Sequence, residues 1–216
     1  MSNLSLSQEY MMCALNDKGK ISTFNFERVI AVAASAVAEL MMDDIIALNG
    51  KKLSVKKALP AEKSYLSPVY DFIEKTERVG FKTVVEHFSF TLSSKNIDEL
   101  FDSIGGSLVR AGCAKKEKRG MLGNKNAYIP DAKAVDAVVQ NIRAEMLEDG
   151  ALSEDIAALT AILNKTGELM RFFSAYEKKD VKKRLKEIRD AAENKEIAKV
   201  IDYVEELMMI IIVSAT

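Results

Sequence analysis

The segment from Asn25 to Met42 is apolar on every face of the helix that it predicts. Between Val29 and Ala38 it carries no charge, and Ser35 is the one polar side chain of that interval. A helix that is apolar all round lies either among other helices or in lipid, and this stretch is shorter than the roughly 18 residues that a bilayer span needs. We therefore expect a buried central helix around which a mainly α-helical domain folds.

Apolar residues recur at spacings of three and four in most of the remaining chain, which predicts amphipathic outer helices. The expected helices are one opened by Ser7, one opened by Ser67-Pro68, one over residues 81–90, one from Ser94 or Asn96 to Arg110, one over residues 131–149, one capped by Ser153, and charged surface helices from Asp180. The final apolar tail, residues 210–213, is expected to be a docked terminal helix.

Two short β-hairpins are predicted, each following a helix. In the first, Ile45–Leu48 and Lys51–Lys57 flank Asn49-Gly50, and an Asn-Gly pair between two such runs strongly favours a tight hairpin turn. The second runs from Cys113 to Pro130 and has a longer connection. The pattern thus predicts a helical core with one or two small hairpins.

Composition favours one soluble domain over residues 1–216. The chain is 48% apolar and 29% charged, and no stretch rich in Pro, Ser and Gly divides it. Its 31 basic and 32 acidic residues nearly cancel, so the net charge points to no class of partner. The cysteines lie in apolar contexts and the first residues lack a basic region followed by an apolar signal core, so we expect a cytoplasmic location.

The residue types that support catalysis are scarce. The chain has one histidine, His87, no tryptophan and two cysteines, Cys13 and Cys113, so a metal site or a histidine-based triad has almost nothing to build on. Its glycines do not form a nucleotide-binding motif. We expect no enzymatic activity, no cofactor and no metal, with His87 packed or on the surface and both cysteines in the core.

Basic residues concentrate on the two predicted hairpins. The second hairpin carries Arg110, Lys115, Lys116, Lys118, Arg119 and Lys125 against the single acid Glu117, and the first carries Lys51, Lys52, Lys56 and Lys57 with no acid. Both clusters follow a helix and lie on a hairpin, so a common basic face is one prediction of the pattern.

The tip of the second hairpin places Met121 and Leu122 among these charges. A basic loop with exposed apolar residues fits a surface that meets anionic lipid headgroups. The alternative is a pair of solvated edge strands whose lysines prevent aggregation. The charge pattern taken alone favours this alternative.

Three stretches resemble the Golgi phosphoprotein 3 family. Leu6–Asp17 is similar to the family's opening helix and acidic turn, and Ala36–Met42 to the end of its central helix. Ser107–Gly112, followed by a basic hairpin and Tyr128-Ile129-Pro130, is similar to its second helix and hairpin. The resemblance extends over nearly the whole chain.

The resemblance implies a helical domain with a four-helix core, outer amphipathic helices and a β-hairpin that packs between protomers in oligomers. Eukaryotic members of the family are cytosolic proteins that bind phosphatidylinositol 4-phosphate on Golgi membranes and act as adaptors for glycosyltransferase tails. For this chain the resemblance implies a homo-oligomer that is peripheral to the cytoplasmic face of a membrane.

The lipid pocket of the family combines an aromatic residue at the start of the central helix with arginines on the two long helices. By position, the aromatic residue is similar to Phe24, whereas the arginines fall near Ala33, Asp98 and Phe101, none of which is basic. An aspartate that faced a phosphate would repel it, so these positions argue against the specific headgroup pocket.

Resemblance and local charge together predict a peripheral protein that binds anionic phospholipid. The residues expected at the lipid are Phe24, Arg28, Arg110, Lys115, Lys116, Lys118 and Arg119, with Met121 and Leu122 inserting into the membrane or joining protomers. The alternative is a soluble helical module for protein interaction or self-association that has lost phosphoinositide binding. Nucleic acid is not expected as a partner, because the helix Asn96–Val109 presents acids where a groove reader needs Lys and Arg.

Overall fold

The computed structural model describes residues 4–21, 26–50, 52–76, 79–89, 94–119, 125–148, 150, 152–190 and 209. Three predicted features lie outside the described residues: Phe24, the hairpin tip with Met121 and Leu122, and the apolar tail over residues 210–213.

Helices dominate the described part of the chain, which confirms the predicted mainly-α class. The α-helices are α1 (Leu6–Ala14), α2 (Phe26–Met42), α3 (Ser67–Lys75), α4 (Phe81–Ser89), α5 (Lys95–Arg110), α6 (Ala132–Leu147), α7 (Glu154–Lys165) and α8 (Glu177–Asp190). Two 3₁₀ helices are η1 (Ala61–Leu66) and η2 (Leu169–Phe172). Within the described residues, no helix is both long enough and apolar enough to cross a bilayer.

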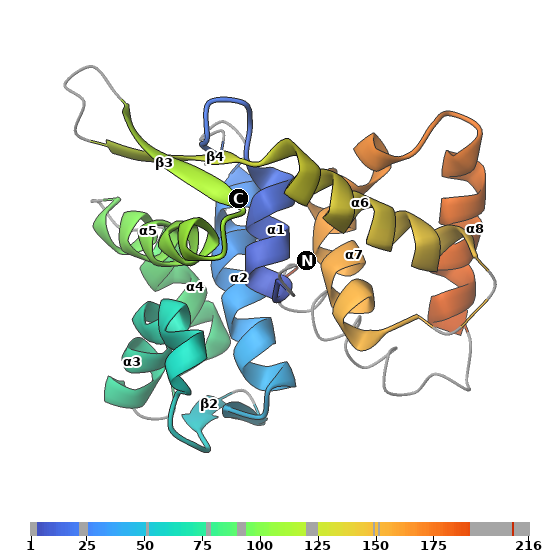
Figure 1. The fold of residues 1–216 in the computed structure, drawn as a ribbon. Coiled ribbons are helices and arrows are strands. Elements are labelled where there is room, and N and C mark those ends of the chain that lie inside the picture. Colours follow the sequence, from blue (N-terminus) through green and yellow to red (C-terminus); the bar gives the residue numbers. More distant parts are fainter. Residues whose placement is uncertain are drawn as a thin grey trace.

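Helix α2 is the centre of the fold. Every residue from Ile30 to Leu40 is buried, and Val29 is half-buried. The helix contacts α1, α3, α4, α5 and α7, with α3 to α5 on one side of the α1–α2 pair and α6 to α8 on the other (Figure 1). The prediction of an enclosed central helix is confirmed, and its run of alanines is what lets so many neighbours approach closely.

Both predicted hairpins form. Strand β1 (Ile46–Asn49) pairs antiparallel with β2 (Lys52–Val55), and Gly50 supplies a positive φ of 64° at the turn. Strand β3 (Ala114–Arg119) pairs antiparallel with β4 (Lys125–Pro130), so that Lys116 lies opposite Tyr128.

The prediction that the two hairpins share one basic face is wrong. Figure 1 places β1–β2 at one end of the molecule and β3–β4 at the other. The reason is α2 itself, whose 17 residues span about 25 Å. Strand β1 follows the C-terminal end of α2, whereas β4 packs on Gly19, in the loop that precedes its N-terminal end.

Two predicted helix starts are also corrected. Helix α1 begins after Ser5, whose backbone N–H donates to Oε1 of Gln8 at 3.1 Å, and Ser7 lies inside the helix with its hydroxyl bonded to Glu39. Helix α3 continues directly from η1, so Ser67 has helical backbone angles and does not cap. Ser153 caps α7 as predicted, since its hydroxyl accepts the N–H of Ile156 at 3.3 Å.

Tyr128 fixes hairpin β3–β4 to the helical core. Its side chain is fully buried, its ring meets Phe101 edge-on at 5.5 Å, and its hydroxyl donates to Oδ1 of Asp102 at 3.0 Å. Its backbone N–H donates to the carbonyl of Gly19 at 2.9 Å. Burial and the bond to Asp102 raise the pKa of this phenol, so it stays a neutral donor. The hairpin is therefore held rigidly on α5.

Two adjacent glycines of α5 test this attachment. A Cβ at Gly105 would lie 2.5 Å from the ring of Tyr128, whereas one at Gly106 would meet only the end of Arg110 at 3.7 Å. We expect Gly105→Ala to lower the free energy of unfolding by about 1–3 kcal/mol through overpacking. Gly106→Ala should raise it by about 0.5–1 kcal/mol, because alanine favours a helix interior. Urea unfolding measures both, and equal stability of the two variants would contradict the account.

Candidate functional site

Strand β3 presents an exposed row of positive charge. Lys115, Lys116 and Lys118 are exposed, and none of them pairs with a carboxylate among the described residues. The ammonium of Lys116 lies 5.8 Å from the ring centroid of Tyr128, a cation–π distance. Two further charges are partly compensated: Arg119 donates twice to Glu117, at 2.9 and 2.8 Å, and Lys125 lies 3.5 Å from Asp98.

The acids of α5 support this hairpin. Asp102 accepts from the phenol of Tyr128 and from the amide of Asn126, the latter at 2.6 Å, and Asp98 pairs with Lys125. The positions at which the family arginines fall therefore have other roles here. Ala33 is buried within α2, while Asp98 and Phe101 hold β4.

The structure places two of the three predicted arginines, Arg28 and Arg110, at different points of the molecule. Arg110 is exposed at the end of α5, where the chain enters the hairpin. Arg28 is bonded to Glu168, a fully buried carboxylate before η2 whose second oxygen is bonded to Arg171. Its side chain is 22% exposed, so it reaches the surface only in part. Arg28 therefore joins α2 to the residue that precedes η2.

Two lysines beside β4 were missed by the sequence analysis. Lys18 is exposed and Lys20 half-exposed, in the turn that packs on Tyr128 through Gly19. The side chain of Asn16 accepts the backbone N–H groups of both lysines, at 2.9 and 3.3 Å, which fixes the turn. In the sequence, these two lysines are visible only as a pair that flanks Gly19. Their position beside the hairpin depends on tertiary packing and could not be predicted from that pattern.

His87 and the two cysteines occupy packed positions, in line with the prediction. The imidazole of His87 stacks on Phe72 at 3.8 Å between ring centroids, and burial lowers its pKa. Cys13 and Cys113 are buried and do not form a disulfide with each other, and burial raises the pKa of Cys13. Among the described residues, no group of three or more His, Cys, Asp or Glu is arranged to hold a metal ion.

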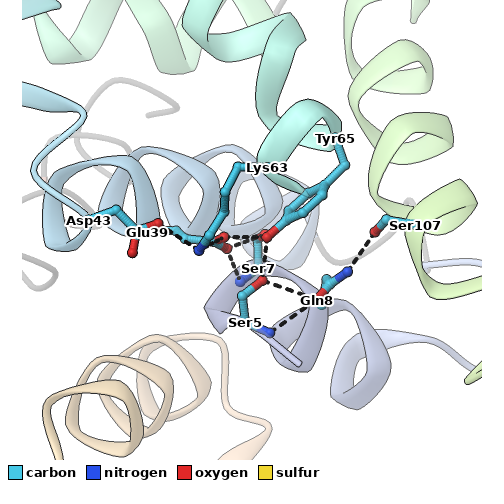
Figure 2. A network of polar contacts seen from close by, with 8 residues as sticks. All are labelled: Ser5, Ser7, Gln8, Glu39, Asp43, Lys63, Tyr65 and Ser107. Atoms are coloured by element: carbon cyan, nitrogen blue, oxygen red, sulfur yellow. Dashed lines mark hydrogen bonds and ion pairs between the residues drawn. The ribbon is translucent and has the colours of Figure 1, made fainter. Parts of the chain in front are cut away.

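A buried polar network surrounds Glu39 of α2 (Figure 2). Its carboxylate accepts from the backbone N–H and hydroxyl of Ser7, at 2.9 and 2.6 Å, from the phenol of Tyr65 and from the ammonium of Lys63 at 2.8 Å. Lys63 also pairs with Asp43 at 2.6 Å. The network therefore ties together α1, α2 and η1.

The charges of Glu39 and Lys63 stabilise each other within this network. Burial alone would raise the pKa of Glu39, but the charge of Lys63 and the hydrogen bonds from Lys63, Ser7 and Tyr65 outweigh it and lower the pKa. The two carboxylates outweigh the burial of Lys63 and raise its pKa. Glu39 and Lys63 therefore form an ion pair that stabilises the packing of α1, α2 and η1.

Glu9 lies on α1 near this network, and its pKa is shifted in the opposite direction from that of Glu39. Burial raises its pKa to about 7, with further contributions from the negative charges of Asp155, Glu145 and Glu39. The pKa of Asp155 is raised as well, mainly by burial. In the folded protein, Glu9 therefore ionises near neutral pH, well above its ordinary value.

Glu9 predicts a pH-dependent loss of stability. A carboxyl whose pKa is raised on folding contributes stability at low pH that is lost as the pH rises from the unfolded to the folded pKa, here from about 4.5 to about 7. The stability of Glu9→Gln should match that of the wild type at roughly pH 4 and exceed it at roughly pH 8, by up to about 2 kcal/mol after allowance for partial exposure. Urea unfolding at the two pH values measures this. A stability difference that is the same at both would contradict it.

Comparison with known protein families agrees with the described geometry. The family described as Golgi phosphoprotein 3 (GPP34) matches residues 6–206, which include α1, the central helix and both hairpins. No individually curated protein matches the sequence. Because the family match covers nearly the whole chain, this protein belongs to the Golgi phosphoprotein 3 family.

Proposed function

We propose that this protein binds anionic phospholipid headgroups at the side of the molecule that carries hairpin β3–β4, as a peripheral protein of the cytoplasmic membrane face. The observation that carries the proposal is the row of exposed lysines Lys115, Lys116 and Lys118 on a rigidly held hairpin of a nearly neutral chain. Membership of a family known for phosphoinositide binding supports it.

The free energy that the exposed basic residues can contribute to membrane binding is modest. A basic residue close to an anionic surface is worth about 1 kcal/mol, so three lysines and Arg110 supply roughly 4 kcal/mol before screening by salt. That corresponds to attraction of about millimolar strength. Stable attachment therefore needs further contacts, from Phe24 and Arg28, from insertion of Met121 and Leu122, or from an oligomer that multiplies the contacts.

Lys18 and Lys20 extend the proposed surface. The loop between α1 and α2 reaches the same side of the molecule as the free end of β3–β4 (Figure 1), whereas β1–β2 lies at the other end. The ligand in this proposal is an anionic headgroup in general. A pocket specific for phosphatidylinositol 4-phosphate is not part of it, because Ala33, Asp98 and Phe101 have the structural roles described above.

Charge reversal on β3 tests the proposal. In Lys115→Glu/Lys118→Glu, we expect co-sedimentation with vesicles of phosphatidylcholine and phosphatidylglycerol to fall by at least about tenfold, because two attractive charges become repulsive. The matched control is Lys52→Glu/Lys57→Glu, which makes the same charge change on exposed residues at the opposite end.

Three outcomes would contradict the proposal: an equal loss in both double variants, wild-type binding that does not depend on anionic lipid, or no wild-type binding at all. In the last case, a hairpin deletion that lowers the molar mass in light scattering would favour the alternative function, self-association.

A further inference from the structure

Tyr176 is an exposed aromatic residue on a rigid turn. Its side chain is 85% exposed, and it makes no ring contact or hydrogen bond within the described part of the chain. It belongs to the connection between η2 and α8. In the view of Figure 1, this connection and the free end of β3–β4 both lie at the top of the molecule.

The residues on both sides of Tyr176 are tied down. Arg143 of α6 donates to the carbonyl of Phe172 at 2.8 Å and pairs with Glu177 at 2.5 Å, and its guanidinium lies 5.7 Å from the ring of Phe173. The backbone N–H of Ser174 donates to Glu177 at 2.8 Å. The turn therefore has a fixed shape that projects Tyr176 outward, and ordering it on binding would cost little conformational entropy.

A group of lysines begins two residues after Tyr176, at Lys178 in the first turn of α8. Val181 is fully buried, and the rotation of about 100° per residue in a helix places Lys178, Lys179 and Lys182 together on the arc from about 60° to 160° away from it. Lys179 and Lys182 are exposed. The acids Asp180 and Glu187 lie on the other flank of the helix, so the lysine arc is uninterrupted.

The stability of α8 does not account for these lysines. Positive side chains in the first turn oppose the partial positive charge at a helix N-terminus, a place that favours acids such as Glu177. Neither Lys178 nor Lys179 pairs with a carboxylate among the described residues. An exposed aromatic beside unpaired lysines has the composition of a membrane-interface contact, because the ring suits the headgroup layer and the long stems carry the charges to the phosphates.

We propose that Tyr176, Lys178, Lys179 and Lys182 form a second contact with the anionic membrane surface. This inference rests on the proposed function and deepens it. Tyr176 lies at headgroup depth and the lysines meet the lipid phosphates. Two contacts at separate points of one side fix the orientation of the protein on the membrane, and their joint binding exceeds either alone through effective concentration.

The absence of tryptophan from the chain makes a direct test possible, because Tyr176→Trp introduces a single tryptophan that can be excited selectively over the tyrosines. On vesicles of phosphatidylcholine and phosphatidylglycerol, we expect its emission to shift to shorter wavelength and to be quenched by lipids with brominated acyl chains. Lys75→Trp, an exposed position at the end of α3, is the matched control and should not change. Lys179→Glu/Lys182→Glu should weaken co-sedimentation by about tenfold, and Lys52→Glu/Lys57→Glu should not.

The outcomes separate this inference from the proposed function. If the protein sediments with anionic vesicles but the emission of Tyr176→Trp is unchanged, the second contact is wrong while the proposed function stands. If the wild type does not sediment with anionic vesicles, both are wrong. An equal shift for Lys75→Trp would also overturn the inference, because contact would then not be confined to one side.

Discussion

The enclosure of α2 determines where everything else in this fold lies. A helix whose residues from Ile30 to Leu40 are all buried needs neighbours on every side, and five other helices supply them. The one carboxylate within that stretch, Glu39, is tolerated because Lys63, Ser7 and Tyr65 satisfy it. With its sides covered, the helix leaves only its two ends for other elements, so the hairpins are far apart and only one of them can face a given surface.

The elements that depend on local pattern could be predicted from the sequence. The apolar character of α2, the β1–β2 hairpin and the Ser153 cap each need only neighbouring residues, and each is confirmed. Within the hairpin, Asn49 ends β1 and pairs with Lys52, so the turn begins after Asn49. The predicted start of α1 was wrong. Ser7 is a good capping residue by type, but its hydroxyl bonds to Glu39, more than thirty positions away in the sequence. Long-range partners of this kind leave no signal in local periodicity.

In the candidate site as well, the local pattern was predictable and the tertiary contacts were not. The lysines of β3 were visible as a cluster in the sequence, but their orientation depends on the packing of Tyr128 against Gly105. Asp98 was expected to repel a phosphate, whereas it pairs with Lys125 of β4 at the surface. Charged surface helices were expected from Asp180, but no role was assigned to Tyr176. Its exposure follows from the contacts of Arg143 and cannot be read from its neighbours in the sequence.

The central claim is that one side of this protein faces an anionic membrane. Hydrogen–deuterium exchange of the wild-type chain on vesicles of phosphatidylcholine and phosphatidylglycerol tests it most directly, because every segment is observed at once. The account predicts slower exchange over residues 114–119 and 174–182 and unchanged exchange over residues 46–55 of the opposite hairpin. Slower exchange confined to residues 46–55, or no change in any segment of vesicle-bound protein, would contradict it.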